Sequence, residues 1–182
     1  MQKTFLILFT LLFLFSCEKS AEKNYKTLPV ETFLSGGLER EYTLYIPPSA
    51  SKNSPLVFML HGLGSTNTII MNYSQMNQVA DKYGFAVCYP QGIKSSKASI
   101  YTKKGSTFWN VGYDTHKDET VNDIEFITSL AQYLQNEHNF NPEKTFCAGM
   151  SNGGDMSYLL GCQAPDVFKA IAPITGCMMG WI

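Results

Sequence analysis

The sequence lacks an excess of charge of either sign, and it lacks the motifs of nucleotide sites. Lysine and arginine total 14 and aspartate and glutamate total 15, so the net charge is −1. Without a basic surplus to neutralise phosphates, nucleic-acid binding is not expected. No Walker loop is present and no GxGxxG follows an apolar run, which disfavours nucleotide binding. Internal repeats and low-complexity runs are missing too. The 182 residues, 45% of them apolar, predict one folded domain or most of one.

Cysteine pairs at metal-binding spacing are also missing. None of the five cysteines belongs to a CxxC pattern, and no histidine lies near one at zinc-site spacing, so we expect no metal or other cofactor. Cys88 and Cys147 each lie within an apolar run and are interpreted as small buried side chains. Because an exported chain can form disulfides, Cys162 and Cys177 are the pair that we expect to be bridged.

The longest apolar run, from Phe5 to Phe15, is too short to span a bilayer as a helix. A core of this length after a positive residue, here Lys3, is typical of a secretory leader. The run ends in Ser16-Cys17, which resembles a bacterial lipobox, where the cysteine is acylated and becomes the mature N-terminus. The alternatives are an ordinary leader that is cut nearby, or a buried apolar segment.

On the lipobox interpretation, residues 1–16 are a lipoprotein signal peptide and Cys17 carries the lipid. Residues 17–29 then form a polar tether between the lipid and the domain. Removal of the leader takes away one lysine, so the mature charge is 13 − 15 = −2. We therefore expect an exported protein, either a cell-envelope lipoprotein held on the membrane by its lipid anchor or an extracellular protein.

Residues 30–182 alternate between strand and helix patterns. Runs that are apolar on both faces, such as Leu56–Leu60, are typical of strands covered by helices on either side. The patterns predict an α/β domain with a mostly parallel, doubly wound sheet and right-handed crossovers. Residues 91–119 predict a long functional loop or insertion, and Thr120-x-x-Asp123 resembles a capping box at a helix start. The predicted strands are 31–35, 41–46, 56–60, 85–89, 145–148 and 168–174, and the predicted helices are 73–83, about 121–138 and 152–162.

The sharpest motif is Gly149-Met150-Ser151-Asn152-Gly153, a GxSxG pattern between a predicted strand and a predicted helix. A nucleophile on such a tight turn has a strained backbone and crowded neighbours, so only very small residues fit two positions away on either side, here the two glycines. Ser151 is therefore the candidate nucleophile. The Asn152 N–H, at the start of the helix, can face a developing oxyanion. The alternative is a structural glycine turn.

A glycine-rich loop, His61-Gly62-Leu63-Gly64, follows the central predicted strand. Such a loop can bring a backbone N–H beside the nucleophile, and we assign the second oxyanion donor to Leu63, with Gly62 as the next choice. The alternative is a plain turn at a strand end. His61 itself is interpreted as a structural residue that holds this loop rather than as a base.

The segment Gly149–Gly154, followed by Ala172–Gly176, resembles the secreted esterases grouped with polyhydroxybutyrate depolymerases and feruloyl esterases. Arg40–Pro48, Trp109-Asn110 and Val121–Phe126 fit the same pattern. The resemblance implies an α/β-hydrolase that cleaves carboxylic esters, often on plant polysaccharides or polyester. It also implies that Ser151 is the nucleophile and that Leu63 and Asn152 form the oxyanion hole.

One departure from this family concerns the catalytic acid and base. In α/β-hydrolases both follow the serine along the chain, yet His61, His116 and His138 all precede Ser151. We therefore expect a fragment whose last strands are missing, with residues 30–182 as the N-terminal part of the fold, inactive or nearly so. The strand 168–174 would then be an exposed apolar edge that invites aggregation. A substitute base from the long loop, His116, is the alternative.

Two other functions remain open at this point: a serine peptidase of the prolyl-oligopeptidase type, and a non-catalytic, carbohydrate-binding surface lipoprotein. The fold alone does not separate them from an esterase. The long loop contains four aromatic residues: Tyr101, Phe108, Trp109 and Tyr113. They either form an exposed platform for sugar or feruloyl rings or pack between the loop and the domain.

Overall fold

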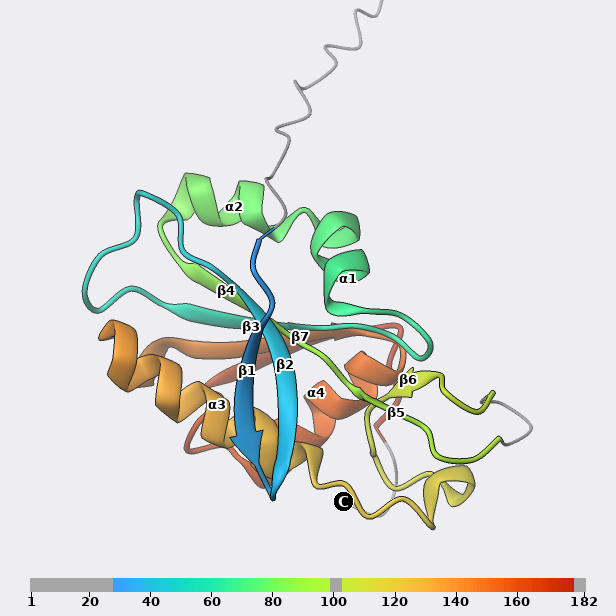
Figure 1. Ribbon diagram of the computed structural model, residues 1–182. Coiled ribbons are helices and arrows are strands. Elements are labelled where there is room, and N and C mark those ends of the chain that lie inside the picture. Colours follow the sequence, from blue (N-terminus) through green and yellow to red (C-terminus); the bar gives the residue numbers. More distant parts are fainter. Residues whose placement is uncertain (1–27, 99–102, 179–182) are drawn as a thin grey trace, which may run out of the picture.

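The computed structural model describes residues 28–98 and 103–178, which form a six-stranded sheet with helices on both faces (Figure 1). The leader 1–16, the lipidation candidate Cys17, nearly all of the tether 17–29, and Tyr101 lie outside the described residues. The sheet order is β1-β2-β4-β3-β7-β8. Its strands are β1 (Glu31–Ser35), β2 (Leu38–Tyr45), β3 (Leu56–Leu60), β4 (Ala86–Pro90), β7 (Thr145–Met150) and β8 (Ala170–Ile174).

The sheet is mostly parallel, which confirms the predicted fold class. Strands β4, β3, β7 and β8 run parallel, whereas β1 and β2 form an antiparallel hairpin at one edge. The hairpin turns at Gly36-Gly37, where both residues have positive φ (56° and 78°), as expected for glycine. Strand β3 lies between β4 and β7, and this central position explains why its run is apolar on both faces.

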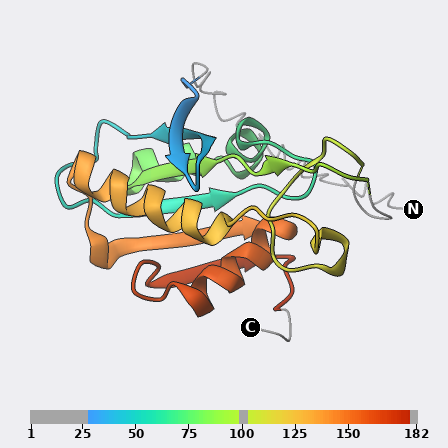
Figure 2. The ribbon, with the colours of Figure 1, turned by 60° about the horizontal axis from the view of Figure 1, so that its bottom comes forward.

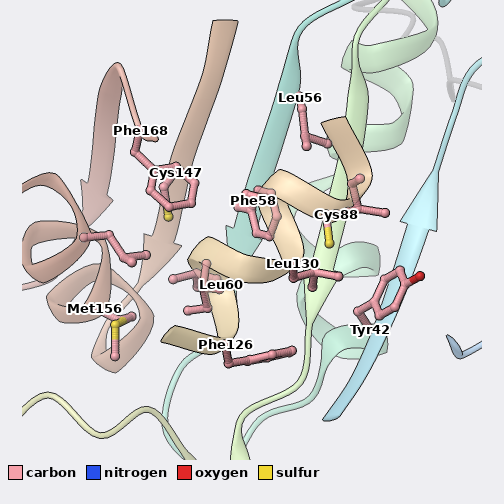
Figure 3. Close-up of a cluster of buried hydrophobic side chains, with 14 of the residues drawn as sticks. Tyr42, Leu56, Phe58, Leu60, Cys88, Phe126, Leu130, Cys147, Met156 and Phe168 are labelled. Atoms are coloured by element: carbon pink, nitrogen blue, oxygen red, sulfur yellow. The ribbon is translucent and has the colours of Figure 1, made fainter. Parts of the chain in front are cut away.

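Helices cover the two faces in pairs (Figures 1 and 2). The pair α3 (Asp123–His138) and α4 (Asn152–Gln163) packs on one face, and the pair α1 (Asn67–Ser74) and α2 (Met76–Tyr83) packs on the other. Alternate residues of β3 point to opposite layers, so Phe58 belongs to the larger core and Met59 to the smaller one. Figure 3 shows the larger core, where Phe58 and Phe168 meet edge to face at 5.5 Å and where Cys88 and Cys147 are buried as predicted.

The helix ends differ from the sequence prediction in two places. Asn122, not Thr120, caps α3, because its side chain accepts the Glu125 N–H at 3.1 Å, so the capping-box prediction was wrong. The helix predicted from residue 73 begins earlier and is two helices, since Gln75 adopts a left-handed conformation (φ 52°) between α1 and α2. The predicted stop at Gly84 is confirmed, with φ 73°.

The long loop after β4 is folded against the domain. It contains a short hairpin of β5 (Ile93–Lys94) and β6 (Thr107–Phe108) and a 3-10 turn, Asp114–His116. Phe108 and Trp109 are fully buried, so these two rings cover the loop's contact with the domain and form no exposed platform. Tyr113 is partly buried against the larger core.

The expected Cys162–Cys177 disulfide is wrong, because both thiols are free and exposed. The Cys177 N–H donates to Asp155 Oδ1 at 2.6 Å, which fixes Cys177 near the first turn of α4. Cys162 lies seven residues further along that helix, and at 1.5 Å per residue this is about 10 Å away. A disulfide needs Cα atoms closer than about 7 Å.

Strand β8 is an edge strand of the described sheet, as predicted for this segment. It pairs with β7 and has no second neighbour among residues 28–98 and 103–178. Ile171 packs toward α4 and the larger core, whereas Ile174 is 47% exposed. This leaves apolar surface at the edge.

Candidate active site

Ser151 stands on a sharp turn between β7 and α4. Its backbone has φ 53° and ψ −123°, a combination that non-glycine residues rarely adopt and that costs of order 1–3 kcal/mol. Two hydrogen bonds hold the turn: the Ser151 N–H donates to Ile174 O at 2.9 Å, and the Asp155 N–H donates to Ser151 O at 3.0 Å. The side chain is exposed. A serine held in a strained conformation yet open to solvent is the arrangement of a nucleophile elbow.

The two glycines of the motif are required by close packing. A Cβ on Gly149 would lie 2.2 Å from Gly153 O, and a Cβ on Gly153 would lie 2.6 Å from both Leu60 O and His61 O. These neighbours are backbone atoms and cannot move aside. The spacing of GxSxG therefore follows from the contact between the elbow and the end of β3.

The loop after β3 runs directly beside the elbow. A Cβ on Gly62 would lie 3.3 Å from Met150 O and 3.5 Å from Ser151 Cβ. Two amides further along the loop are engaged, since Gly64 N–H donates to Thr107 O at 2.7 Å and Ser65 N–H donates to Gly62 O at 3.1 Å. Within the described part of the chain, no acceptor receives the Leu63 N–H. Asn152 is the first residue of α4, and such N–H groups have no partner inside their helix.

His61 is a structural residue of this loop. Its Nε2 accepts the Gly92 N–H at 2.9 Å, so its Nδ1 carries the proton and donates to Gly62 O at 2.8 Å. The ring is fully buried, and this burial lowers its pKa to about 4. A neutral imidazole with both nitrogens engaged has no free lone pair for Ser151.

Trp109 ties the loop to the elbow. Its indole N–H donates to His61 O at 2.8 Å, and its backbone N–H donates to Asn152 Oδ1 at 2.8 Å. The Asn152 amide returns a hydrogen bond to Trp109 O at 3.1 Å. Sequence reasoning missed this role, because the contacts join residues more than 40 positions apart. The only signal was that Trp109-Asn110 fitted the family pattern.

A buried ion pair holds Asn110, the residue after Trp109 in the long loop. Asp123 accepts a hydrogen bond from Arg40 Nη2 at 2.6 Å through one oxygen and from the Asn110 N–H at 2.7 Å through the other. Both charged side chains are almost fully buried, and the Arg40 guanidinium lies 4.0 Å from the centre of the Phe126 ring. The pair joins β2, the long loop and α3 behind the site.

Asp155, in the first turn of α4, is also buried. One oxygen accepts the Tyr113 hydroxyl and the other accepts the Cys177 N–H. Burial and this carboxylate raise the pKa of Tyr113 well above its ordinary value. Asp155 thus joins the long loop, the elbow helix and the segment after β8, and both of its oxygens are engaged away from Ser151.

The other two histidines do not reach the nucleophile. His116 packs 4.2 Å from the Phe108 ring and 5.5 Å from the Tyr113 ring, and burial lowers its pKa. His138 lies at the end of α3, 5.4 Å from the Phe140 ring. All three histidines are among the described residues, and none of them hydrogen-bonds to the Ser151 hydroxyl. The structure therefore does not support the substitute base at His116.

Two hollows of about 460 and 390 Å³ flank the start of β2, and both are lined by Leu38, Arg40 and Ile93. The larger continues to the start of α1, and the smaller to the start of α3. Neither is lined by Ser151, Leu63 or Asn152, so neither contains the candidate nucleophile.

The family model described as "Esterase PHB depolymerase" matches residues 40–182. The chain belongs to this esterase family. The match contains the elbow, the Gly62–Leu63 loop, Trp109 and the Arg40–Asp123 pair. It confirms the resemblance drawn from the sequence.

Curated relatives are similar to this chain over about three quarters of its length. It is 28% identical over 138 residues to feruloyl esterase B of Thermothelomyces thermophilus, covering 75% of the chain and 44% of the relative. It is 24% identical over 140 residues to a bifunctional acetylxylan esterase/xylanase of Neocallimastix patriciarum, covering 77% of the chain and 18% of the relative. The chain thus spans less than half the length of these relatives.

Solved structures agree on the fold. An acetyl xylan esterase from Aspergillus awamori superposes with a TM-score of 0.59 at 18% identity, covering 79% of this chain and 50% of that one. An S-formylglutathione hydrolase from Agrobacterium tumefaciens gives 0.62 at 18% identity, covering 78% and 55%. The α/β-hydrolase fold is therefore established for this member of the family.

Proposed function

We propose that Ser151 is the nucleophile of an exported serine esterase that acts on carboxylic esters of polysaccharides or of a polyester. The observation that carries this proposal is the strained, exposed Ser151 with the Gly62–Leu63 loop packed against it. Relatives named feruloyl esterase and acetylxylan esterase support a polysaccharide-linked ester. The family name supports a polyester as the other substrate class.

In this reaction the Ser151 oxygen attacks the ester carbonyl and its proton passes to a general base. The carbonyl oxygen becomes an oxyanion, which the Leu63 and Asn152 backbone N–H groups stabilise from two sides. The N-terminus of α4 adds its positive end to the same place. Collapse of the tetrahedral intermediate expels the alcohol and leaves an acyl-serine, which water then hydrolyses.

We find no general base for Ser151 among the described residues. Serine is a weak nucleophile without one, and His61, His116 and His138 are all held elsewhere. We propose that the triad base and acid lie outside these 182 residues, and that the chain alone is inactive or nearly so. Residues 30–182 are, on this proposal, the nucleophile-bearing part of the fold.

Export and anchoring complete the proposal. Residues 1–16 serve as the lipoprotein signal peptide, Cys17 takes the lipid, and residues 17–29 form the tether. Among the described residues, no helix combines the length and apolar character that crossing a membrane requires. On this proposal, the protein is held to the cell envelope by its N-terminal lipid.

Chemical rescue tests the nucleophile and the missing base together. The 182-residue chain is incubated with a fluorophosphonate probe, with and without added imidazole as an external base. We expect negligible labelling alone and clear labelling with imidazole, lost in Ser151→Ala and retained in Ser51→Ala, an exposed serine remote from the elbow. Strong labelling without imidazole would reveal a base within the chain, and labelling that survives Ser151→Ala would remove the nucleophile assignment.

A substrate comparison then separates ester from peptide chemistry. Under imidazole rescue, aryl acetates, feruloyl esters and 3-hydroxybutyrate esters should release their alcohols faster with the parent chain than with Ser151→Ala, because imidazole alone also cleaves activated esters. Aminoacyl amides should not react. Release from the amides at a comparable rate would favour the peptidase alternative. Binding of xylan without any release would favour the non-catalytic lipoprotein.

A further inference from the structure

The outer surface of α1 and α2 carries apolar side chains that nothing in the described structure covers. Ile69 and Tyr73 on α1 are 55% and 72% exposed, and Val79 and Tyr83 on α2 are 38% and 65% exposed. Within each helix the two residues are four positions apart, so they share one face. We call these four residues the α1–α2 patch.

The patch is poor in charge. Among the exposed residues of the two helices, Lys82 is the only charged one, and its Nζ lies 5.0 Å from the centre of the Tyr83 ring. The single acid of these helices, Asp81, is half-buried and accepts the Tyr45 hydroxyl. The remaining exposed side chains are uncharged: Thr68, Asn72, Gln75 and Gln78. An apolar and aromatic surface with one cation and no exposed carboxylate suits a lipid interface with anionic headgroups.

The N-terminal segment enters the fold on this same side. Leu28, the first described residue, packs against the small core beneath α1 and α2, which contains Ile70, Met71 and Ala80. Figure 1 shows the beginning of the described chain beside α2. Cys17 and Leu28 are eleven residues apart, and a chain of that length reaches at most about 40 Å. A lipid on Cys17 therefore keeps this side of the domain nearest to the bilayer.

We propose that the α1–α2 patch docks on the surface of the membrane that holds the lipid of Cys17. The inference rests on the lipid anchor in the proposed function, but not on the ester chemistry. Tyrosine side chains favour the headgroup region, where the ring is buried and the hydroxyl stays hydrated. Docking by this face lays the sheet along the membrane, with Ser151 at a lateral edge, open to polymer that lies over the surface.

Depth-dependent quenching tests the docked orientation in the acylated full-length protein. Tyr73→Trp places a reporter in the patch, and Tyr133→Trp is the matched control, since Tyr133 is a 42% exposed tyrosine on α3, on the opposite face. The proteins are reconstituted in phosphatidylethanolamine–phosphatidylglycerol vesicles whose acyl chains are brominated, after mass spectrometry has verified the acyl group on Cys17. The spectrum of the parent protein, with its native tryptophans, is subtracted.

We expect several-fold stronger quenching at position 73 than at position 133. Adding Ile69→Ser and Tyr83→Ser to Tyr73→Trp should shift the docking equilibrium about tenfold toward the undocked form, because apolar area is lost from the contact. Equal quenching at the two positions would show a freely tumbling domain on its tether and overturn the proposal. No quenching at either position would do the same, and would leave the patch to a protein partner. Neither outcome touches the Ser151 assignment, because ester cleavage is not measured.

Discussion

Replacing Asp123 by alanine removes the partner of a buried arginine. Arg40 is 4% exposed and keeps only a contact of 3.3 Å to Gln91 O and the face of the Phe126 ring. Breaking one half of a buried ion pair costs about 3–5 kcal/mol, because the remaining charge stays desolvated. The Asn110 N–H also loses its acceptor, which adds about 1–3 kcal/mol if that group stays buried. A domain of this size is stable by about 5–15 kcal/mol, so the loss is a large share of the total.

The assay is urea unfolding followed by circular dichroism, with Asp118→Ala as the matched control. Asp118 also pairs with a cation, Lys97, at 3.0 Å, but both side chains are more than half exposed. Because water and salt screen an exposed pair, this variant should unfold at the same urea concentration as the parent. The paired change Arg40→Met with Asp123→Leu should recover part of the stability lost in Asp123→Ala, since no charge then stays buried.

The reasoning would be refuted if Asp123→Ala and Asp118→Ala shifted the midpoint equally. A midpoint for the paired variant at or below that of Asp123→Ala would show that the hydrogen bond to Asn110, rather than the charge, dominates. The two outcomes therefore separate the effect of the buried charge from the effect of the lost hydrogen bond to Asn110.

Three further predictions follow from burial and close packing. Because burial lowers the His61 pKa to about 4 while the unfolded value stays near 6.5, the unfolded chain takes up the proton first. The free energy of unfolding should therefore decrease as the pH falls from 6.5 toward 4, by up to about 3 kcal/mol; a pH-independent value in urea titrations would contradict the buried neutral ring. Gly153→Ala should lower the free energy of unfolding by about 1–3 kcal/mol or more. The loss should exceed that of Gly161→Ala, because the new methyl at position 161 meets only the movable Ile171 side chain. Equal thermal midpoints for the two variants would contradict this. Cys162 and Cys177 should react with a thiol reagent in the native state, whereas the buried Cys88 and Cys147 should react only after unfolding. Any number of reactive thiols other than two among these four in the native protein would contradict the structure.

The sheet could be predicted because the pattern of apolar residues in each strand shows which of its faces are covered. Leu56–Leu60 is apolar on both faces since it pairs with neighbours on both sides and has helices above and below. The elbow was predictable for a similar reason, because the glycines that the turn requires have no substitute. In both cases the constraint acts on neighbouring residues, so the pattern is local and visible in the sequence.

Long-range contacts were not predictable in this way. Nothing near Trp109 indicates that its indole donates to a carbonyl 48 positions earlier, or that Asn152 holds its backbone. The Arg40–Asp123 pair joins residues 83 positions apart, and buried charges look like surface charges in a sequence. The capping box failed because Asn122 competed with Thr120 for the same helix end, and both types are good caps.

The residues that hold the loop after β3 and the Ser151 turn, Thr107 and Trp109, lie at the end of the β5–β6 hairpin that is nearer to the sheet. Thr107 holds the Gly64 amide, and Trp109 holds both His61 and Asn152, all on the scaffold side of the hairpin. A change in length between residues 96 and 105 should therefore not alter the turn at Ser151. Replacement of the segment between residues 96 and 105 should accordingly leave the backbone of Ser151 in place.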